Sequence, residues 1–255
     1  MTYFSLTLFI AFIFSCNLQN TDDTKSLNDL SNTEIDEVNE IPLPAGYKRV
    51  TASEHSFTNW LRSIKIKKDK QVHLYDGSLK KNQSAQFAVL DIPVGNKNLQ
   101  QCADAVIRLR AEYLFTKKRF NEIIFSDNNG KEYKWTHQDN RQEFEKYLET
   151  VFGWCGSASL EKQLNPVSEL SEIEPGNVFI KGGYPGHAMI VMDVAVNKKG
   201  EKIFMLAQSY MPAQEIHIVK NPIDQNLSPW YKADTSEIIF TPEWKFYKNQ
   251  LRRWQ

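Results

Sequence analysis

The chain has 255 residues, of which 41% are hydrophobic and 24% charged, a composition typical of a globular protein with a sizeable core. Its 31 basic and 31 acidic residues give a formal net charge of zero, so no overall field attracts nucleic acid or an anionic membrane surface. The composition therefore excludes binding through bulk charge, and we expect no nucleic-acid partner.

The first segment of the chain is an apolar run from Leu6 to Phe14. It is too short to span a bilayer, which needs about 20 apolar residues, but it fits the hydrophobic region of a signal peptide. The run leads into Ile13-Phe14-Ser15-Cys16, which resembles a bacterial lipobox and implies lipidation of Cys16. We therefore expect residues 1–16 to be a signal peptide. The protein would be exported to the cell envelope and held to a membrane by a lipid anchor only.

Residues 17–41 are rich in Asn, Asp, Glu and Thr and contain no aromatic residue. Such a composition cannot bury enough surface to fold, so we expect a flexible tether. After it, no internal repeat and no Pro/Gly/Ser-rich linker interrupts the sequence. We therefore predict a single domain over residues 42–255.

The hydrophobic pattern predicts helices first and strands afterwards. Helices are expected over residues 57–62, 99–116, 142–152 (ending at Gly153) and 157–164, with strands at 71–74 and 86–92. From residue 177 onward the pattern changes to apolar or alternating runs bounded by turn residues, at 177–180, 187–196, 202–210, 215–219 and 237–241. This order predicts an α+β fold with a mostly antiparallel sheet.

Cys102 is the first member of an apolar stripe on the helix predicted over residues 99–116. Helical spacing places Val106, Leu109 and Tyr113 on the same face, so the thiol faces the core. A thiol in the first turn is also placed where the helix dipole and unpaired amides favour a thiolate and can hold an oxyanion. Two interpretations follow, a nucleophile or a buried structural cysteine.

His187 stands at the first position of the strand predicted over residues 187–196, directly after a glycine-rich loop. This placement suits a general base, although the placement alone favours a strand-edge histidine bonded to solvent. A four-residue turn at 197–200 would pair His187 with Tyr210 and Met189 with Gln208, placing Gln208 on the face of His187. A buried amide needs a partner, and orienting a catalytic histidine is the task of the third member of a triad.

These motifs resemble the papain-like superfamily, and within it the NlpC-type cell-wall peptidases and their amidase relatives. The resemblance rests on Gln-Cys at a helix start, an E-P-G-N turn, P-G-H opening a strand, and a polar residue in the following strand. It implies a papain-like α+β fold with Cys102 as nucleophile, His187 as base and Gln208 as the orienting residue.

The chain also resembles the bacterial lipoprotein family known as domain-of-unknown-function family 4846. The matching segments run from PAGYKRV through QQCADAVIRLRAEYL, PGHAMIV and LAQSYMPAQEIHI to TPEW. This resemblance covers the whole predicted domain and implies no established activity.

Cys155 and the remaining histidines offer alternatives to a Cys102 nucleophile. Cys155, in GWCGSASL, is a second candidate nucleophile, and a disulfide between Cys102 and Cys155 would silence both thiols in an exported protein. The histidines show no metal-ligand spacing, so we expect neither a metal nor a cofactor. The sequence thus predicts a thiol hydrolase that cleaves an amide bond in a cell-wall or other exported peptide. The alternative is a non-catalytic envelope lipoprotein that uses the same fold to bind.

Overall fold

The computed structural model describes Met1 and residues 35–255. The predicted lipidation site Cys16, the rest of the predicted signal peptide after Met1, and residues 17–34 of the predicted tether lie outside the described residues. Ile35–Gln255 form one compact unit. Within the described residues, no helix is both long enough and apolar enough to cross a membrane.

The described residues contain the four predicted α-helices. They are α1 (Phe57–Arg62), α2 (Cys102–Thr116), α3 (Arg141–Trp154) and α4 (Ser157–Lys162). Side-chain caps mark two starts, because Ser56 accepts from the Asn59 amide at α1 and Asn140 accepts from the Glu143 amide at α3. At α2 the chain is extended at Gln101, so the helix predicted from residue 99 begins at Cys102 itself.

Most strands of the described part belong to one large sheet of nine strands, paired antiparallel throughout. They are β1 (Tyr47–Arg49), β2 (Gln86–Val89), β5 (Asn165–Pro166), β6 (Val178–Lys181), β7 (His187–Asn197), β8 (Lys202–Gln208), β9 (His217–Val219), β10 (Trp230–Ala233) and β13 (Leu251–Arg253). Two hairpins stand apart, formed by β3 (Ile124–Ser126) with β4 (Glu132–Lys134) and by β11 (Ile238–Phe240) with β12 (Lys245–Tyr247). Short 3-10 turns lie at Val38–Glu40, Phe120–Glu122, Leu170–Glu172 and Lys248–Gln250.

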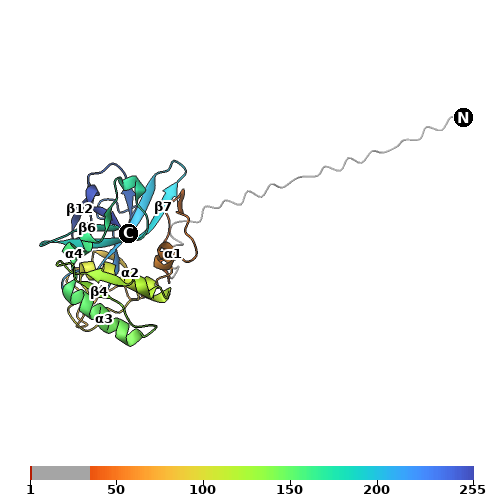
Figure 1. Ribbon diagram of the computed structural model, residues 1–255. Helices are drawn as coiled ribbons and strands as arrows, with labels where there is room; N and C mark the ends of the chain where they lie inside the picture. The colour runs from red at the N-terminus through yellow and green to blue at the C-terminus, as the bar shows by residue number, and fades with distance from the viewer. Residues whose placement is uncertain (2–34) are drawn as a thin grey trace. The chain divides into compact units, whose positions relative to one another are not determined.

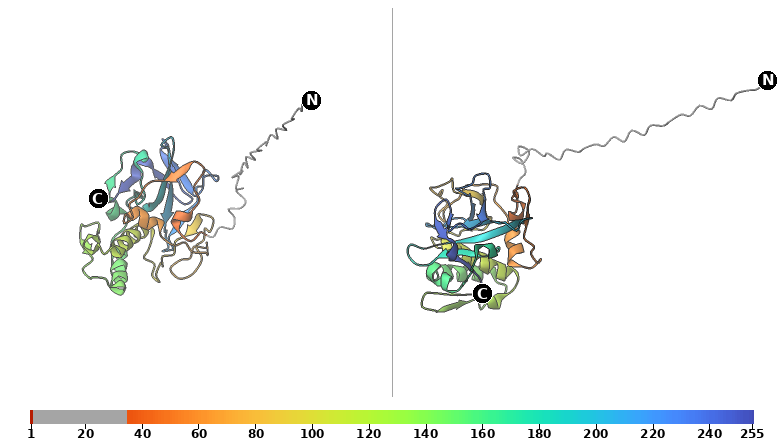
Figure 2. Two further views of the ribbon diagram at one scale, coloured as in Figure 1. Left: turned by 90° about the vertical axis from the view of Figure 1, so that its right-hand side faces the viewer. Right: turned by 90° about the horizontal axis from the view of Figure 1, so that it is seen from above.

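The predicted α+β class is confirmed. The main path of the sheet runs β2-β9-β8-β7-β6-β13-β5, with β1 added to β7 and β10 added to β8. In Figure 1, α2, α3 and α4 lie together on one side of β6, β7 and β12, and the turned views of Figure 2 show the same grouping of helices apart from the C-terminal strands. The strand predicted at 71–74 is wrong, because this segment makes only isolated bridges, from His73 to Leu79 and from Leu74 to Gln214.

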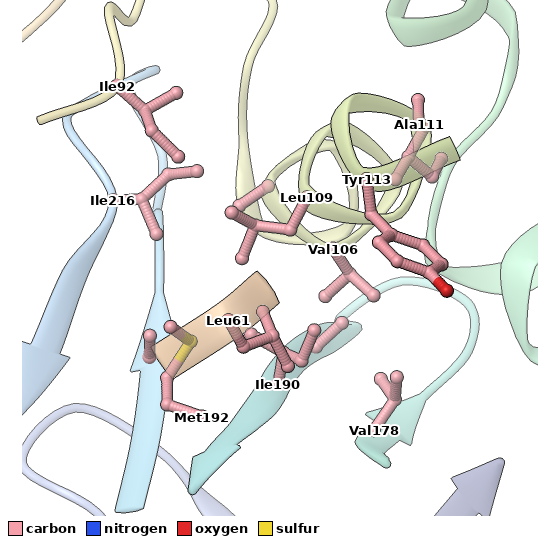
Figure 3. Packing of buried hydrophobic residues seen from close by; sticks show 14 of the residues in the cluster. Leu61, Ile92, Val106, Leu109, Ala111, Tyr113, Val178, Ile190, Met192 and Ile216 are labelled. Atoms are coloured by element: carbon pink, nitrogen blue, oxygen red, sulfur yellow. The ribbon is translucent and has the colours of Figure 1, made fainter. Parts of the chain in front are cut away.

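The core on the helical side of the sheet is built around α2. Val106, Leu109 and Tyr113 are almost fully buried and project from α2 toward the sheet, as Figure 3 shows together with Ile190 and Met192 of β7. The predicted apolar stripe is therefore present. A second cluster fills the opposite face, so β7 is buried on both sides, which explains its uninterrupted apolar run.

A β-bulge in the β7–β8 hairpin places the site. Near the turn Val196 pairs with Lys202, but beyond the bulge at Met192 the pairing shifts by one residue, to Ile190 opposite Ala207. The turn itself is shorter than the predicted four residues, because Asn197 bonds to Glu201 across it, with Gly200 at a φ of 83°. The turn is one residue shorter than predicted, and the extra residue of the bulge in β7 shifts the pairing back by one position. The register that was predicted at the site end of the hairpin therefore holds there, although the predicted turn was wrong.

Candidate active site

The three predicted site residues lie at the ends of three elements. Cys102 begins α2, His187 begins β7 and Gln208 ends β8. Cys102 and His187 line the same cavity, which has a volume of about 600 Å³. Gln208 lies behind His187 and is not exposed in the cavity wall. The fold thus brings together residues that are separated by more than a hundred positions in the chain.

A hydrogen bond joins His187 to Gln208. The distance between His187 Nε2 and Gln208 Oε1 is 2.8 Å, and each side chain belongs to a residue that is 1% exposed. Because an amide oxygen only accepts, Nε2 of the imidazole carries the proton. The other ring nitrogen, Nδ1, is then the basic nitrogen of the neutral ring.

The nitrogen end of the Gln208 amide also has hydrogen-bond partners. Gln208 Nε2 donates to Glu243 Oε2 at 2.8 Å and lies 3.3 Å from His217 Nε2. Lys80 Nζ lies 2.6 Å from the same Glu243 oxygen. Sequence reasoning missed these three residues, since Lys80 and Glu243 come from segments with no periodic pattern and His217 reads as an ordinary strand residue.

Aromatic rings surround His187. Ring centroids lie 4.8 Å away for Tyr210, 5.2 Å for Trp244 and 5.9 Å for Phe246. Burial among these rings lowers the pKa of His187 to about 4, and the hydrogen bond that the ring donates to Gln208 opposes that shift only partly. The imidazole is therefore neutral at neutral pH, in the form that can accept a proton. Tyr210 was predicted to pair with His187 across the hairpin, and it is instead a ring neighbour beyond the end of β8.

Cys102 lies directly beside the start of β7. The backbone of Ala188, the residue after His187, is hydrogen-bonded to the Cys102 sulfur and favours its thiolate, as do the first amides of α2. Burial outweighs them and raises the pKa of the Cys102 thiol, and the neighbouring Asp104 raises it further. The prediction that the helix N-terminus lowers the pKa of Cys102 is therefore wrong in net direction. Removing the thiolate from water destabilises it by more than the helix dipole stabilises it.

Asp104 is the carboxyl of the first turn of α2 and lies in the wall of the same cavity. One of its oxygens, Oδ2, accepts from the backbone amide of Gln101 at 2.9 Å, which caps the helix. The other, Oδ1, is buried and has no hydrogen-bond partner among the described residues. Burial raises the pKa of this carboxyl well above its ordinary value.

The cavity also holds Cys155, the second candidate nucleophile. Cys102 and Cys155 are both free thiols, so the structure contains no disulfide between them. Burial raises the pKa of Cys155 to about 12. At the rim, Tyr184 is 98% exposed and Met211 58% exposed. No Lys or Arg is among the residues that line this cavity in the described part of the chain.

Sequence comparison identifies the family. A family model described as Domain of unknown function (4846) matches residues 38–141 and 133–253, which is most of the chain. The chain belongs to this family. Neither a curated protein nor a solved structure matches it. The resemblance to family 4846 is confirmed, and because membership assigns no activity, the chemistry is argued from the site.

The arrangement suits acyl transfer to sulfur. A thiol at a helix start and a neutral imidazole with an oriented Nε2–H share one cavity, and the amides of the first turn of α2 lie beside the sulfur. Within residues 35–255, no group of three or more His, Cys, Asp or Glu side chains is placed to hold a metal ion.

Proposed function

We propose that this protein is a thiol hydrolase of papain-like type that cleaves an amide bond, with Cys102 as nucleophile and His187 as base. The observation that carries the proposal is the His187–Gln208 hydrogen bond of 2.8 Å at the back of a cavity that Cys102 also lines. This bond assigns the ring proton to Nε2 and leaves Nδ1 of His187, a residue that lines the cavity, available as a base.

The first chemical step forms the bond between the Cys102 sulfur and the carbonyl carbon of the substrate. His187 Nδ1 takes the thiol proton as the sulfur attacks, because both groups are neutral at rest: burial raises the pKa of the thiol and lowers that of the imidazole. The negative charge that develops on the carbonyl oxygen is stabilised by backbone amides at the start of α2.

The second step breaks the carbon–nitrogen bond and the third releases the acid. The imidazolium gives its proton to the leaving nitrogen, so an amine departs and a thioester remains on Cys102. Water then attacks the thioester while His187 accepts one water proton and returns it to the sulfur. The sum is one amide and one water consumed, with one acid and one amine formed.

The substrate class we propose is a peptide exposed in the cell envelope, including a cell-wall peptide. The export of the chain and its anchoring through Cys16 are part of this proposal. The cavity disfavours an anionic segment near the scissile bond, since its lining among the described residues contains no Lys or Arg to pair with an anion and its rim carries Tyr184 and Met211.

The test is hydrolysis of a cell-wall peptide digest, followed by mass spectrometry of the new products. We expect Cys102→Ala to abolish release of new amino groups, whereas the matched variant Cys155→Ala keeps hydrolysis within a few-fold of the parent. Circular dichroism of both variants checks that the fold persists. Full activity of Cys102→Ala, or loss of activity only in Cys155→Ala, contradicts the assignment.

One observation favours a second function, a non-catalytic module that binds envelope peptides. Burial and Asp104 raise the pKa of the Cys102 thiol, which keeps it a poor nucleophile at rest. A binding module would retain affinity for the peptide digest in the Cys102→Ala variant and would show no turnover in the parent chain. Calorimetric titration of both proteins with the same digest separates the two functions.

A further inference from the structure

We propose that Glu243, held in place by Lys80, is a positioning residue that fixes the tautomer of His187 through the Gln208 amide. This inference rests on the proposed thiol hydrolase, in which His187 Nδ1 must be the basic nitrogen. Neither Glu243 nor Lys80 lies next to the other site residues in the sequence, and both reach the site only through the fold.

The argument starts from the chemistry of an amide. The side chain of Gln208 has one accepting oxygen and one donating nitrogen, and the two ends are nearly equal in shape. A carboxylate only accepts, so Glu243 Oε2, 2.8 Å from the amide, can face only the nitrogen end. The oxygen end must then face His187, and at 2.8 Å it requires a proton on Nε2.

His217 enforces the same orientation from a second direction. Its Nδ1 lies 2.9 Å from the backbone oxygen of Glu215, which can only accept, so Nδ1 carries the ring proton. Its Nε2 is therefore an acceptor and lies 3.3 Å from Gln208 Nε2. Both hydrogens of the Gln208 amide thus have acceptors, and a reversed amide would place its oxygen against two acceptors.

Lys80 helps to hold the carboxylate of Glu243 in position beside the Gln208 amide. The ammonium lies 2.6 Å from Glu243 Oε2, and Lys80 is 5% exposed. Burial lowers the pKa of Lys80, while the hydrogen bond and charge of Glu243 raise it. Asn82 donates to the other oxygen of Glu243 at 3.1 Å, so the carboxylate is oriented at both oxygens.

The carboxylate is reachable from outside the catalytic cavity. Glu243 lines a second cavity of about 580 Å³, and Trp244, which contacts the His187 ring, lines both cavities. The side chain of Glu243 is 15% exposed, compared with 0% for Asp193, the buried carboxylate of the sheet core. Glu243 itself is not among the residues that line the cavity with Cys102, so its substitution replaces no side chain of that lining.

The experiment measures the tautomer directly, by long-range proton–nitrogen NMR of the imidazoles in the full chain labelled with ¹⁵N. In the parent, we expect His187 to show a protonated Nε2 and an unprotonated Nδ1. In Glu243→Gln the amide of residue 243 can donate or accept, so Gln208 keeps only the weaker preference that His217 imposes, and the His187 nitrogen shifts move toward the average of the two tautomers. Hydrolysis should then lose up to about twofold in kcat with KM unchanged, since His187 is in the wrong tautomer for up to about half of the time.

Matched variants separate this role from a structural one. Glu237→Gln removes a surface ion pair to Lys248 at the opposite end of the β11–β12 hairpin, whose turn carries Glu243, and should leave the His187 nitrogen shifts unchanged. Glu243→Asp keeps the charge but withdraws it by one methylene, so it should produce a smaller shift in the same direction, and it replaces Glu243→Gln if that variant does not fold.

Unchanged His187 nitrogen shifts in the Glu243 variants overturn the positioning role, whatever their activity. The proposed function fails in a different way, through full hydrolysis by Cys102→Ala. A tautomer shift in a chain without hydrolysis would confirm the positioning of His187 while the hydrolase is wrong, so the two proposals can fail independently.

Discussion

The two ends of the Gln208 amide carry two buried histidines that serve different purposes. His217, in β9, is fully buried and uses both ring nitrogens, one toward the Glu215 backbone and one toward Gln208. His187, at the start of β7, is 1% exposed, uses one nitrogen for Gln208 and lines the cavity that contains Cys102. Burial lowers the pKa of both rings, to about 4 for His187 and to about 3 for His217.

The comparison teaches that a perturbed pKa alone does not identify a catalytic histidine. His217 has the larger shift, yet both its nitrogens already have partners and it is sealed within the sheet. What distinguishes His187 is an uncommitted nitrogen in a neutral ring that borders a cavity with a thiol. Four experiments test this distinction, from the largest expected effect to the smallest.

Replacing each histidine by asparagine should separate chemistry from stability. His187→Asn removes the base, so hydrolysis of the peptide digest should fall by about 10³-fold while the fold persists. His217→Asn leaves the base in place but disturbs buried hydrogen bonds, so it should cost about 2 kcal/mol of unfolding free energy with less than a tenfold loss of hydrolysis. Product analysis and urea unfolding measure the two effects. Equal loss of hydrolysis in both variants would erase the distinction between the rings.

Acid should destabilise the chain through both histidines. Their folded pKa values, about 4 and about 3, lie below the unfolded value of 6.5, so the unfolded chain binds more protons in that window. This contribution to stability is fully present above about pH 6.5 and is lost as the pH falls toward the folded values. At pH 5 the loss should be on the order of 2 kcal/mol per histidine, measured by urea unfolding at pH 7.5 and 5.

The variant His217→Asn provides the control for this pH effect. Because it retains only one of the two buried imidazoles, its stability should fall less steeply between pH 7.5 and pH 5 than that of the parent. A parent chain and variant with the same pH dependence would show that His217 does not titrate as its burial requires.

Gly186→Ala should disturb His187 and leave His217 untouched. A Cβ at this position would lie 2.3 Å from the Gly183 carbonyl oxygen and 2.8 Å from that of Lys181, so the backbone before β7 must move. We expect a loss of about 1–3 kcal/mol in unfolding free energy and about a tenfold loss of hydrolysis. Gly153→Ala, in α3, meets no atom within 4 Å and should be neutral or stabilising by up to about 1 kcal/mol. Normal stability and activity of Gly186→Ala would contradict the close packing at the start of β7.

Asp104→Asn should change the thiol and not the base. The charged form of this carboxyl raises the pKa of Cys102 and of Cys155, so its removal should speed alkylation of Cys102 by iodoacetamide several-fold at a pH above the raised pKa of Asp104. The asparagine oxygen can still accept from the Gln101 amide, which preserves the helix cap. The exposed Asp91→Asn serves as the matched control, with no expected change in rate. A slower rate in Asp104→Asn would show that the carboxyl acts on Cys102 other than through its charge.

Much of the site could be predicted from local pattern. The position of Cys102 at a helix start, of His187 at a strand start and of Gln208 on a neighbouring strand all follow from periodicity, which depends on residues near in sequence. The hairpin register at Gln208 was right at the site end although the turn was wrong, because the bulge at Met192 compensates for the shorter turn. No pattern in a single sequence signals such a compensation.

The sequence by itself determined the four helices and the longer strands of the sheet, with His187 at the start of one of them, because helical and strand periods and turn residues act over short distances. The tertiary structure alone decided the state of those residues. It packed aromatic rings around His187 and removed the Cys102 thiol from water, which raises the pKa of that thiol. It also brought His217 and Glu243 into contact with the Gln208 amide, and Lys80 into contact with Glu243. These effects depend on desolvation and on partners from distant segments, and both exist only once the chain has folded.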